Sequence, residues 1–200
     1  MQIKTSETEI KHLLIAWLAL SFAFSVLIKR WIPLDYSQSW LAIFALSAVT
    51  VGSAFVLHEL SHKFVAQRYG CWSEFRMEPS MLLLAVVLPF FMPFIFAAPG
   101  AVIISSPYLT REENGKIAIA GPLMNIALAF LFFPLFFFAP PGIFKEIGWF
   151  GVMINAWLAL FNMIPAGVLD GRKVWAWDKK VYGLVLGLPV IVLLLSEILT

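Results

Sequence analysis

At residues 56–66 the chain reads VLHELSHKFVA, and this stretch contains the pattern HExxH at His58, Glu59 and His62. Side chains four residues apart on a helix lie on one face, one turn from each other. Two imidazoles in that arrangement can bind one zinc ion together. Glu59 would lie beside the ion, where it can polarise a bound water molecule. The stretch therefore predicts a helix that carries a metal site.

The residues before the motif are those of a membrane-spanning helix. An apolar run begins near Trp40, and no charged residue occurs between Leu41 and Leu57. An ionisable side chain inside such a helix costs about 2.5–3.5 kcal/mol on insertion scales, and these residues generally serve a function. This setting favours a metal site over the alternative, which is a helix end whose histidines lie among the lipid headgroups.

The composition indicates an integral, multi-pass membrane protein in a lipid bilayer. Of the 200 residues, 61% are hydrophobic and 13% are charged, whereas a soluble domain is about half apolar and about a quarter charged. Cys71 is the only cysteine, which excludes an intramolecular disulfide bond and a metal site built from cysteines. The net charge of +2 gives no reason to expect a nucleic-acid partner. No pattern predicts an oligomeric state.

Six apolar runs approach the length of about 20 residues that a spanning helix needs. They occupy residues 13–28, 40–66, 81–98, 117–139, 147–165 and 181–199. The predicted fold is an all-α polytopic membrane protein with about five transmembrane helices and one membrane re-entrant region that contains a hairpin or strand. All of it is expected to form a single integral membrane domain, residues 1–200.

The run at residues 81–98 is the one that we expect not to cross. Pro89 and Pro93 interrupt its middle, where prolines disrupt a helix. Residues 101–106, AVIISS, are rich in β-branched side chains and predict a strand, or a hairpin that enters the membrane and returns. Non-helical backbone at that depth is tolerated only against protein or a water-filled cavity. We therefore predict a re-entrant region at residues 81–106.

A second polar cluster follows the fifth apolar run, at residues 162–172, which read NMIPAGVLDGR. Two histidines leave a zinc ion in need of a third protein ligand and a water molecule. Asp170 is the candidate, because its carboxylate comes at the end of an apolar run, before a glycine that permits a turn. The alternative is a solvated aspartate in a loop, and the HExxH pattern shifts the balance towards a ligand.

Three motifs together resemble the site-2 proteases, which are intramembrane zinc metalloproteases of the peptidase M50 type. The motifs are HELSH at residues 58–62, GPLMN at 121–125 and NxxPxxxLDG at 162–171. The resemblance covers about residues 53–172. It implies one zinc ion per chain, held by His58, His62 and Asp170. It also implies that Glu59 is the catalytic base and that Asn162 helps to hold the substrate backbone.

The metal-site residues also constrain how the chain crosses the membrane. His58 and His62 lie near the C-terminal end of one helix, and Asp170 is expected at the C-terminal end of another, so both helices must end on the same side. One crossing between them, at 117–139, satisfies this if 81–106 is re-entrant. Eleven of the fourteen Lys and Arg residues then lie on the side where the motifs end. The positive-inside rule makes that side cytoplasmic, in what we expect to be the cell membrane.

The function predicted from these residues is hydrolysis of peptide bonds within or near the transmembrane segments of membrane-protein substrates, as in regulated intramembrane proteolysis. We place the catalytic core at residues 40–172 and a C-terminal helix at 181–199. Two other classes also place histidine and aspartate in membrane helices. They are a zinc or cation transporter and a zinc-bound scaffold without catalysis, and an intact Glu59 argues against both.

The sequence also offers candidate substrate contacts. A spanning substrate has its amides bonded internally and must unwind before cleavage. The strand at 101–105 could offer it an edge through Ala101, Val102 and Ile103. Asn162 is a further candidate, although a helix–helix hydrogen bond explains it equally well, and Asn125 is interpreted as such a packing contact.

Overall fold

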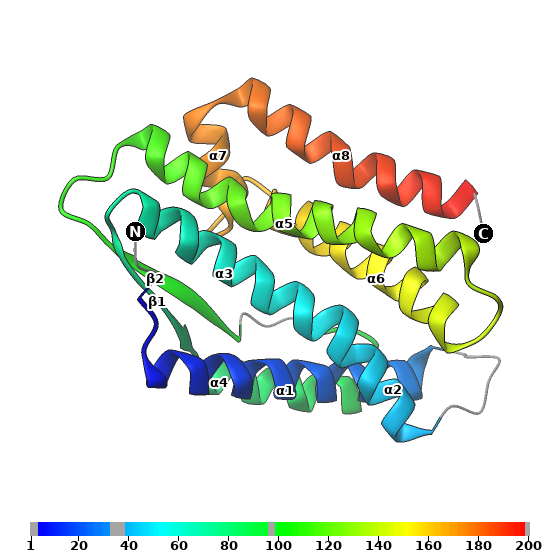
Figure 1. Ribbon diagram of the computed structural model, residues 1–200. Helices are drawn as coiled ribbons and strands as arrows, with labels where there is room; N and C mark the ends of the chain where they lie inside the picture. The colour runs from blue at the N-terminus through cyan, green and yellow to red at the C-terminus, as the bar shows by residue number, and fades with distance from the viewer. Residues whose placement is uncertain (1–3, 33–38, 96–98, 199–200) are drawn as a thin grey trace.

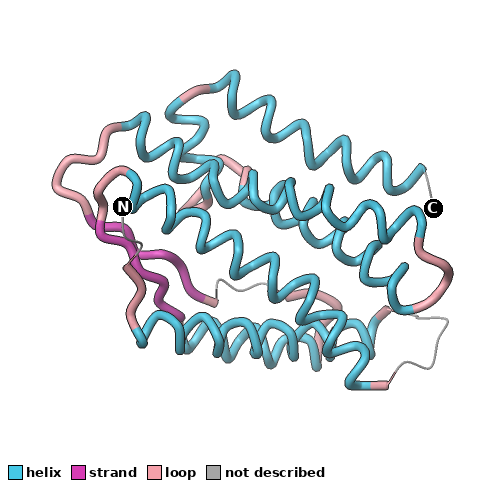
Figure 2. Tube along the Cα trace, in the orientation of Figure 1, coloured by secondary structure: helices cyan, strands magenta, loops and turns pink. Residues whose placement is uncertain are grey.

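Five spans of the described chain are helical, long and apolar enough to cross a membrane. The computed structural model describes residues 4–32, 39–95 and 99–198. The spans are α1 (Glu7–Trp31), α2 to α3 (Trp40–Arg68), α5 (Arg111–Phe138), α6 (Ile143–Asn162) and α8 (Lys179–Ile198). They lie alongside one another in an elongated bundle, with a small sheet near one end (Figure 1, Figure 2). The predicted helical membrane fold with about five spans is confirmed within these ranges.

The span that carries the HExxH pattern contains a widened turn. It consists, in order, of α2 (Trp40–Ser47), the π turn η1 (Ala48–Gly52) and α3 (Ser53–Arg68). Trp17 of α1 packs against the π turn, and its indole nitrogen donates to the carbonyl oxygen of Ala48 at 3.1 Å. A Cβ on Gly52 would lie 2.6 Å from that indole, so the close approach of the two helices requires glycine.

Two short strands form an antiparallel sheet against α1 and α3. β1 is Trp72–Met77 and β2 is Gly100–Ser105, and the register pairs Phe75 with Val102. β2 matches the strand expected at residues 101–105. β1 is absent from the sequence-based expectations, because Glu74 and Arg76 interrupt its apolar pattern. These two side chains pair with each other, with the Arg76 Nη2 2.6 Å from the Glu74 Oε2.

The two ends of the segment that connects β1 to β2 lie next to each other. It contains α4 (Pro79–Val87) and the 3-10 turn η2 (Leu88–Phe90), which pack against α1. The α-helix ends just before Pro89, as expected from the loss of a backbone donor there. At its two ends, the N–H of Glu78 donates to the carbonyl oxygen of Pro99 at 2.9 Å, next to the last rung of the sheet.

α5 lies at the centre of the bundle and packs against α3, α6, α7 and α8 (Figure 1). It begins at Arg111, before the apolar run at 117–139, because Thr110 and Glu113 form a capping box. The N–H of Glu113 donates to Thr110 Oγ1 at 3.2 Å, and the N–H of Thr110 donates to the Glu113 carboxylate at 2.9 Å. The adjoining core is made of buried Ala118, Ile126, Ala159, Met163 and Val174.

Asp170 begins a short helix, so the prediction that it ends a long one is wrong. α6 stops at Asn162, and α7 (Asp170–Trp177) follows after a turn. Pro165 has no N–H with which to continue α6, and Gly167 takes a positive φ of 56°. A carboxylate in the first turn of α7 interacts favourably with the helix dipole. α3 and α6 run in the same direction (Figure 1), so Asp170 still lies towards the end of the bundle where α3 ends.

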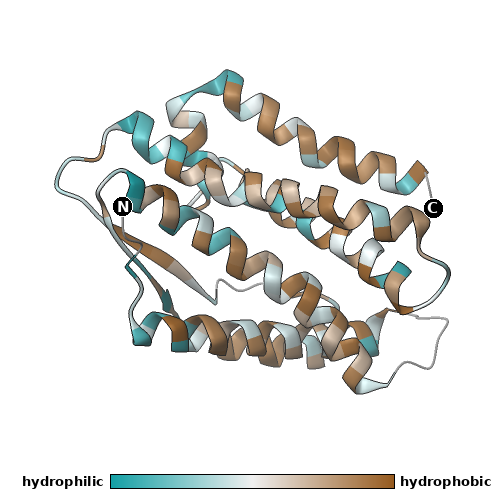
Figure 3. Ribbon diagram, viewed as in Figure 1, coloured by the Kyte–Doolittle hydropathy of each residue, from teal (hydrophilic) through white to brown (hydrophobic). Residues whose placement is uncertain are grey.

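Hydrophilic residues gather at that same end, where α3 ends and where α5 and α8 begin (Figure 3). The helix ends there carry Arg68, Arg111, Lys116, Lys179 and Lys180. The described basic residues at the opposite end are Lys29, Arg30 and Lys145. The two ends of the bundle therefore differ in positive charge.

Candidate metal centre

Three side chains distant in sequence meet inside the bundle. His58 and His62 come from α3 and Asp170 from α7, and all three are buried. The two Nε2 atoms are 3.0 Å apart. The Asp170 Oδ2 lies 3.3 Å from the His58 Nε2 and 3.1 Å from the His62 Nε2. Each residue thus contributes one potential ligand atom to a single point.

The other nitrogen of each imidazole is already bonded. The His58 Nδ1 lies 2.6 Å from the Asn125 Oδ1, and the His62 Nδ1 lies 2.8 Å from the carbonyl oxygen of Ile117. Both partners are acceptors, so Nδ1 carries the proton in each neutral ring and donates it. Both Nε2 atoms then present lone pairs to each other and to a carboxylate.

This donor set fits a zinc ion. Lone pairs that converge within a buried space repel one another unless a cation lies between them. Zinc binds imidazole nitrogen at about 2.0–2.1 Å in tetrahedral geometry, which places neighbouring donor atoms about 3.3 Å apart. The three distances observed are close to that spacing.

Gly121, in the first half of α5, makes room for this cluster. A Cβ at this position would lie 2.4 Å from the His62 Nε2 and 2.5 Å from the His58 Nε2. Any side chain would therefore occupy the space into which the ligand atoms point. The glycine of the GPLMN motif is explained by this approach of α5 to α3.

We predict that Gly121→Ala weakens zinc binding at least about tenfold, because its methyl group must displace an imidazole from the ligand position. The measurement is zinc affinity of purified protein by competition with a chromogenic chelator. Gly187→Ala in α8 is the matched control, since a Cβ there meets no atom within 4 Å. Equal affinity in the two variants would show that the ion does not bind beside Gly121.

A chain of buried amides holds the His58 ring, and it was not recognised from the sequence. The Asn125 Nδ2 donates to the Asn155 Oδ1 at 3.0 Å and to the carbonyl oxygen of Ala54 at 3.2 Å. The Asn155 Nδ2 donates in turn to the carbonyl oxygen of Gly151 at 2.8 Å. These bonds turn the Asn125 Oδ1 towards His58. Asn125 is therefore more than the packing contact expected of it. Its position in the GPLMN motif is the sequence feature that could have indicated this role.

Removing this support should loosen the metal site without removing a ligand. Asn125→Leu is expected to lower zinc affinity by about 10–100-fold, the usual effect of losing a partner that orients a metal ligand. Asn155→Leu should give a loss nearer tenfold, because Asn125 keeps its bond to Ala54. Chelator competition measures both. Asn162→Leu serves as control, and an affinity as low as that of Asn125→Leu would contradict this assignment.

Glu59 points from α3 to the sheet. Its Oε2 accepts a hydrogen bond from the backbone N–H of Val102 at 3.0 Å, and the side chain is buried. Backbone groups of an antiparallel strand alternate in direction, so Val102 presents its donor to the outer edge of β2, whereas Ala101 and Ile103 face β1. Glu59 thus lies between this edge and the metal-ligand cluster.

The opposite edge of the sheet is covered by α1. The backbone N–H of Phe75 donates to the Glu9 Oε1 at 2.9 Å, and that of Met77 lies 3.4 Å from the His12 Nδ1. The outer edge of β2, next to Glu59, is therefore the one where another strand can add.

Asn162 is not joined to this cluster by any contact of the described residues. Its Nδ2 donates to the carbonyl oxygen of Leu158, one turn earlier in α6, at 3.0 Å. The residues that the structure brings together are thus His58, His62 and Asp170, with Glu59 on Val102.

Three potential ligands buried within a bundle of apolar helices, with a glutamate inside an HExxH pattern, indicate an integral membrane protein with a metal site of the kind that metallopeptidases use. The chain belongs to peptidase family M50, whose model matches residues 46–148. This confirms the resemblance recognised from the motifs, and the chain is a metalloprotease by family.

Relatives whose curated names describe zinc metalloproteases support this family assignment. The chain is 46% identical, over 93% of its length and 92% of the relative's, to a protein of Methanocaldococcus jannaschii named "Putative zinc metalloprotease MJ0611". It is 29% identical over 157 residues, 75% of its length, to "Zinc metalloprotease MJ0392" of the same organism, and the match covers 38% of that protein. No solved structure matches the chain.

Proposed function

We propose that this protein is an intramembrane zinc metalloprotease that hydrolyses peptide bonds within or near the transmembrane segments of its substrates. The observation that carries this proposal is the buried cluster of His58, His62 and Asp170 between apolar helices, one residue from Glu59. The position of the cluster between helices that are long and apolar enough to span a membrane supports membrane proteins as the proposed substrate class.

We assign one zinc ion per chain to the three ligands. Zinc bound there would supply a Lewis acid for the scissile carbonyl and lower the pKa of a bound water molecule to about 7. The Asn125 and Ile117 acceptors hold the two imidazoles in the tautomer that binds metal. Glu59 is the proposed base: it accepts the proton of the attacking water and delivers it to the leaving amine.

The unwound substrate is proposed to add to β2 as a third strand. The covered outer edge of β1 and the position of Val102 beside Glu59 support this binding mode. Gly100, Val102 and Ile104 would supply the backbone bonds, and the side chains of Ala101 and Ile103 would flank the substrate. Asn162 is proposed as a further contact of the substrate backbone, for which its amide would leave the carbonyl oxygen of Leu158.

We further propose that residues 81–106 are re-entrant and that the metal-site end of the bundle faces the cytoplasm. The bond between Glu78 and Pro99 supports the first point, because a segment whose ends meet returns to its side of entry. The basic residues at the end where α3 ends support the second. Residues 1–200 would then form one membrane domain in the cell membrane, with its catalytic core at 40–172.

Single cysteines test the re-entrant segment. In a Cys71→Ser background, Arg68→Cys before the sheet and Tyr108→Cys after it are both exposed positions. Both should react with a membrane-impermeant thiol reagent only from the cytoplasmic side. Lys145→Cys, between α5 and α6, should react only from the other side and is the control. Labelling of residues 68 and 108 from opposite sides would mean that the segment spans, and the topology would have to be redrawn.

The protease activity itself can be tested by co-expression with a panel of tagged single-span membrane proteins. We expect at least one of them to be cleaved, with loss of cleavage on zinc chelation and recovery when zinc is restored. Cleavage that survives both chelation and Glu59→Gln would come from another protease, and a panel left intact throughout would count against the proposed function.

A further inference from the structure

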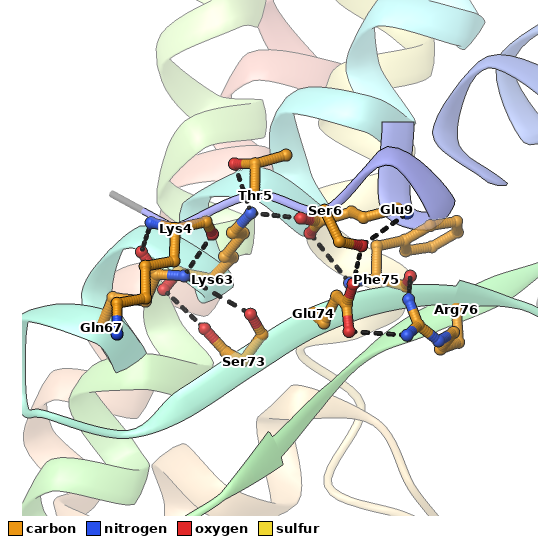
Figure 4. Close-up of polar contacts among 10 residues, drawn as sticks. All are labelled: Lys4, Thr5, Ser6, Glu9, Lys63, Gln67, Ser73, Glu74, Phe75 and Arg76. Atoms are coloured by element: carbon orange, nitrogen blue, oxygen red, sulfur yellow. Dashed lines mark hydrogen bonds and ion pairs between the residues drawn. The ribbon is translucent and has the colours of Figure 1, made fainter. Parts of the chain in front are cut away.

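The residue that follows the HExxH pattern in sequence belongs to a fully buried ion pair. Lys63, the residue after His62, pairs its Nζ with the Glu9 Oε2 of α1, and neither side chain is exposed to solvent. The same ammonium donates to the Thr5 Oγ1 at 2.8 Å (Figure 4). Burying two charges is costly, and an apolar pair often serves stability as well. The pair therefore calls for a role beyond stability.

Glu9 uses its second oxygen to hold the sheet. Its Oε1 accepts the backbone N–H of Phe75 at 2.9 Å, so one carboxylate joins α1, α3 and β1. Two neighbouring contacts reinforce this junction. The Ser6 hydroxyl donates to the Glu74 carboxylate, and the Ser73 hydroxyl lies 3.2 Å from the carbonyl oxygen of Lys63 (Figure 4).

Together with the strand pairing, these contacts form a continuous series of bonds that begins and ends on α3. Phe75 pairs with Val102 across the two strands, and the N–H of Val102 donates to Glu59 on the other edge. Glu59 and Lys63 are four residues apart and therefore lie on one face of α3. One turn of α3 therefore holds the Phe75–Val102 pair from both edges of the sheet. Glu59 binds Val102 directly, and Lys63 reaches Phe75 through Glu9.

We propose that Glu9 and Lys63 are positioning residues that set the β2 edge at a fixed distance from Glu59 and the metal ligands. Because this proposal takes β2 as the substrate edge, it rests on the proposed function. The pair then determines which peptide bond of an added strand comes to Glu59. Neither residue touches the substrate or the ion.

The decisive variant is Glu9→Gln/Lys63→Met. It removes both charges together, so no single charge is left buried, and the glutamine carbonyl can still accept the Phe75 N–H. The link from Lys63 through Glu9 to the sheet is lost while the side-chain volume is kept. The matched control is Glu112→Gln/Lys116→Met, which removes an exposed pair on the first turns of α5, away from the sheet.

Three measurements separate positioning from a purely structural role. Zinc content should equal that of the parent. Hydrogen exchange of residues 100–105 should rise about tenfold, as expected when an element loses a tie worth about one hydrogen bond, while α5 and α6 stay unchanged. With a cleavable substrate, KM should rise more than kcat falls, and cleavage should spread to neighbouring peptide bonds. The control should match the parent in all three.

Parental exchange at residues 100–105 with a parental cleavage site would overturn the proposal. Hydrogen exchange is measured without substrate, so it tests the positioning proposal even if the parent protein cleaves no substrate. Absence of cleavage by the parent would count against the proposed function alone. If the double variant does not fold, Thr5→Val removes one partner of Lys63 and keeps both charges. It should raise exchange of the same segment by a smaller factor, and unchanged exchange would again overturn the proposal.

Discussion

Replacing Glu59 with glutamine is expected to lower peptide hydrolysis by about 10²–10⁴-fold while the protein keeps its fold and its zinc. Such a loss is typical when a general acid–base group is removed. Glutamine is nearly isosteric, and its carbonyl can still accept the N–H of Val102 that Glu59 binds at 3.0 Å. Its amide cannot take a proton from water, so the chemical step should fail while the surroundings persist.

The rate is measured on a substrate from the co-expression panel, with detergent-purified protein of known zinc content. Glu7→Gln changes an exposed carboxylate in the first turn of α1 and is the control. Turnover of Glu59→Gln at the parental rate would assign the base to another residue. A parallel loss of zinc or of helix content would show a structural effect instead.

Replacing His58 with alanine is expected to reduce bound zinc from about one ion per chain to near none. Tetrahedral zinc sites in hydrolases use three protein ligands, and loss of one leaves only a histidine and a carboxylate. The variant also leaves the Asn125 Oδ1 without its imidazole partner, so the site loses both a ligand and the group that oriented it.

Metal analysis of purified protein gives the answer directly. His12→Ala is the matched control, because His12 contacts the N–H of Met77 at the far edge of the sheet. We expect it to retain zinc. Equal zinc in the two variants would remove His58 from the site and would require a new set of ligands.

Local spacing explains why the three residues of the buried cluster could be singled out from the sequence. The i, i+4 relation of His58 and His62 is fixed by helix geometry alone, and Asp170 is the carboxylate of the motif at residues 162–171. The helix of Asp170 could not be assigned in the same way. The apolar run continues past Asn162 to Pro165, whereas in the structure α6 ends at Asn162 and residues 163–169, which include the positive-φ Gly167, separate it from α7.

Long-range contacts account for what the sequence did not reveal. β1 contains charged residues of the kind that a sequence pattern assigns to a loop. In the folded strand the Glu74 carboxylate is satisfied by hydrogen bonds from Ser6 and Arg76. Asn125 lies 67 residues from His58, so no local pattern connects the two. The role of Glu9 depends on three elements at once and is visible only after folding.

The bond between Glu59 and Val102 has a consequence for affinity and selectivity. A strand that adds to β2 needs the N–H that the proposed base already holds, so the two compete for one donor. A hydrogen bond to a charged group is worth about 1.5–3 kcal/mol, and an incoming segment must offset that amount before it binds. On this binding mode, loading of the edge and release of Glu59 are a single event. Peptides too short to reach Val102 would leave the base engaged and would be spared.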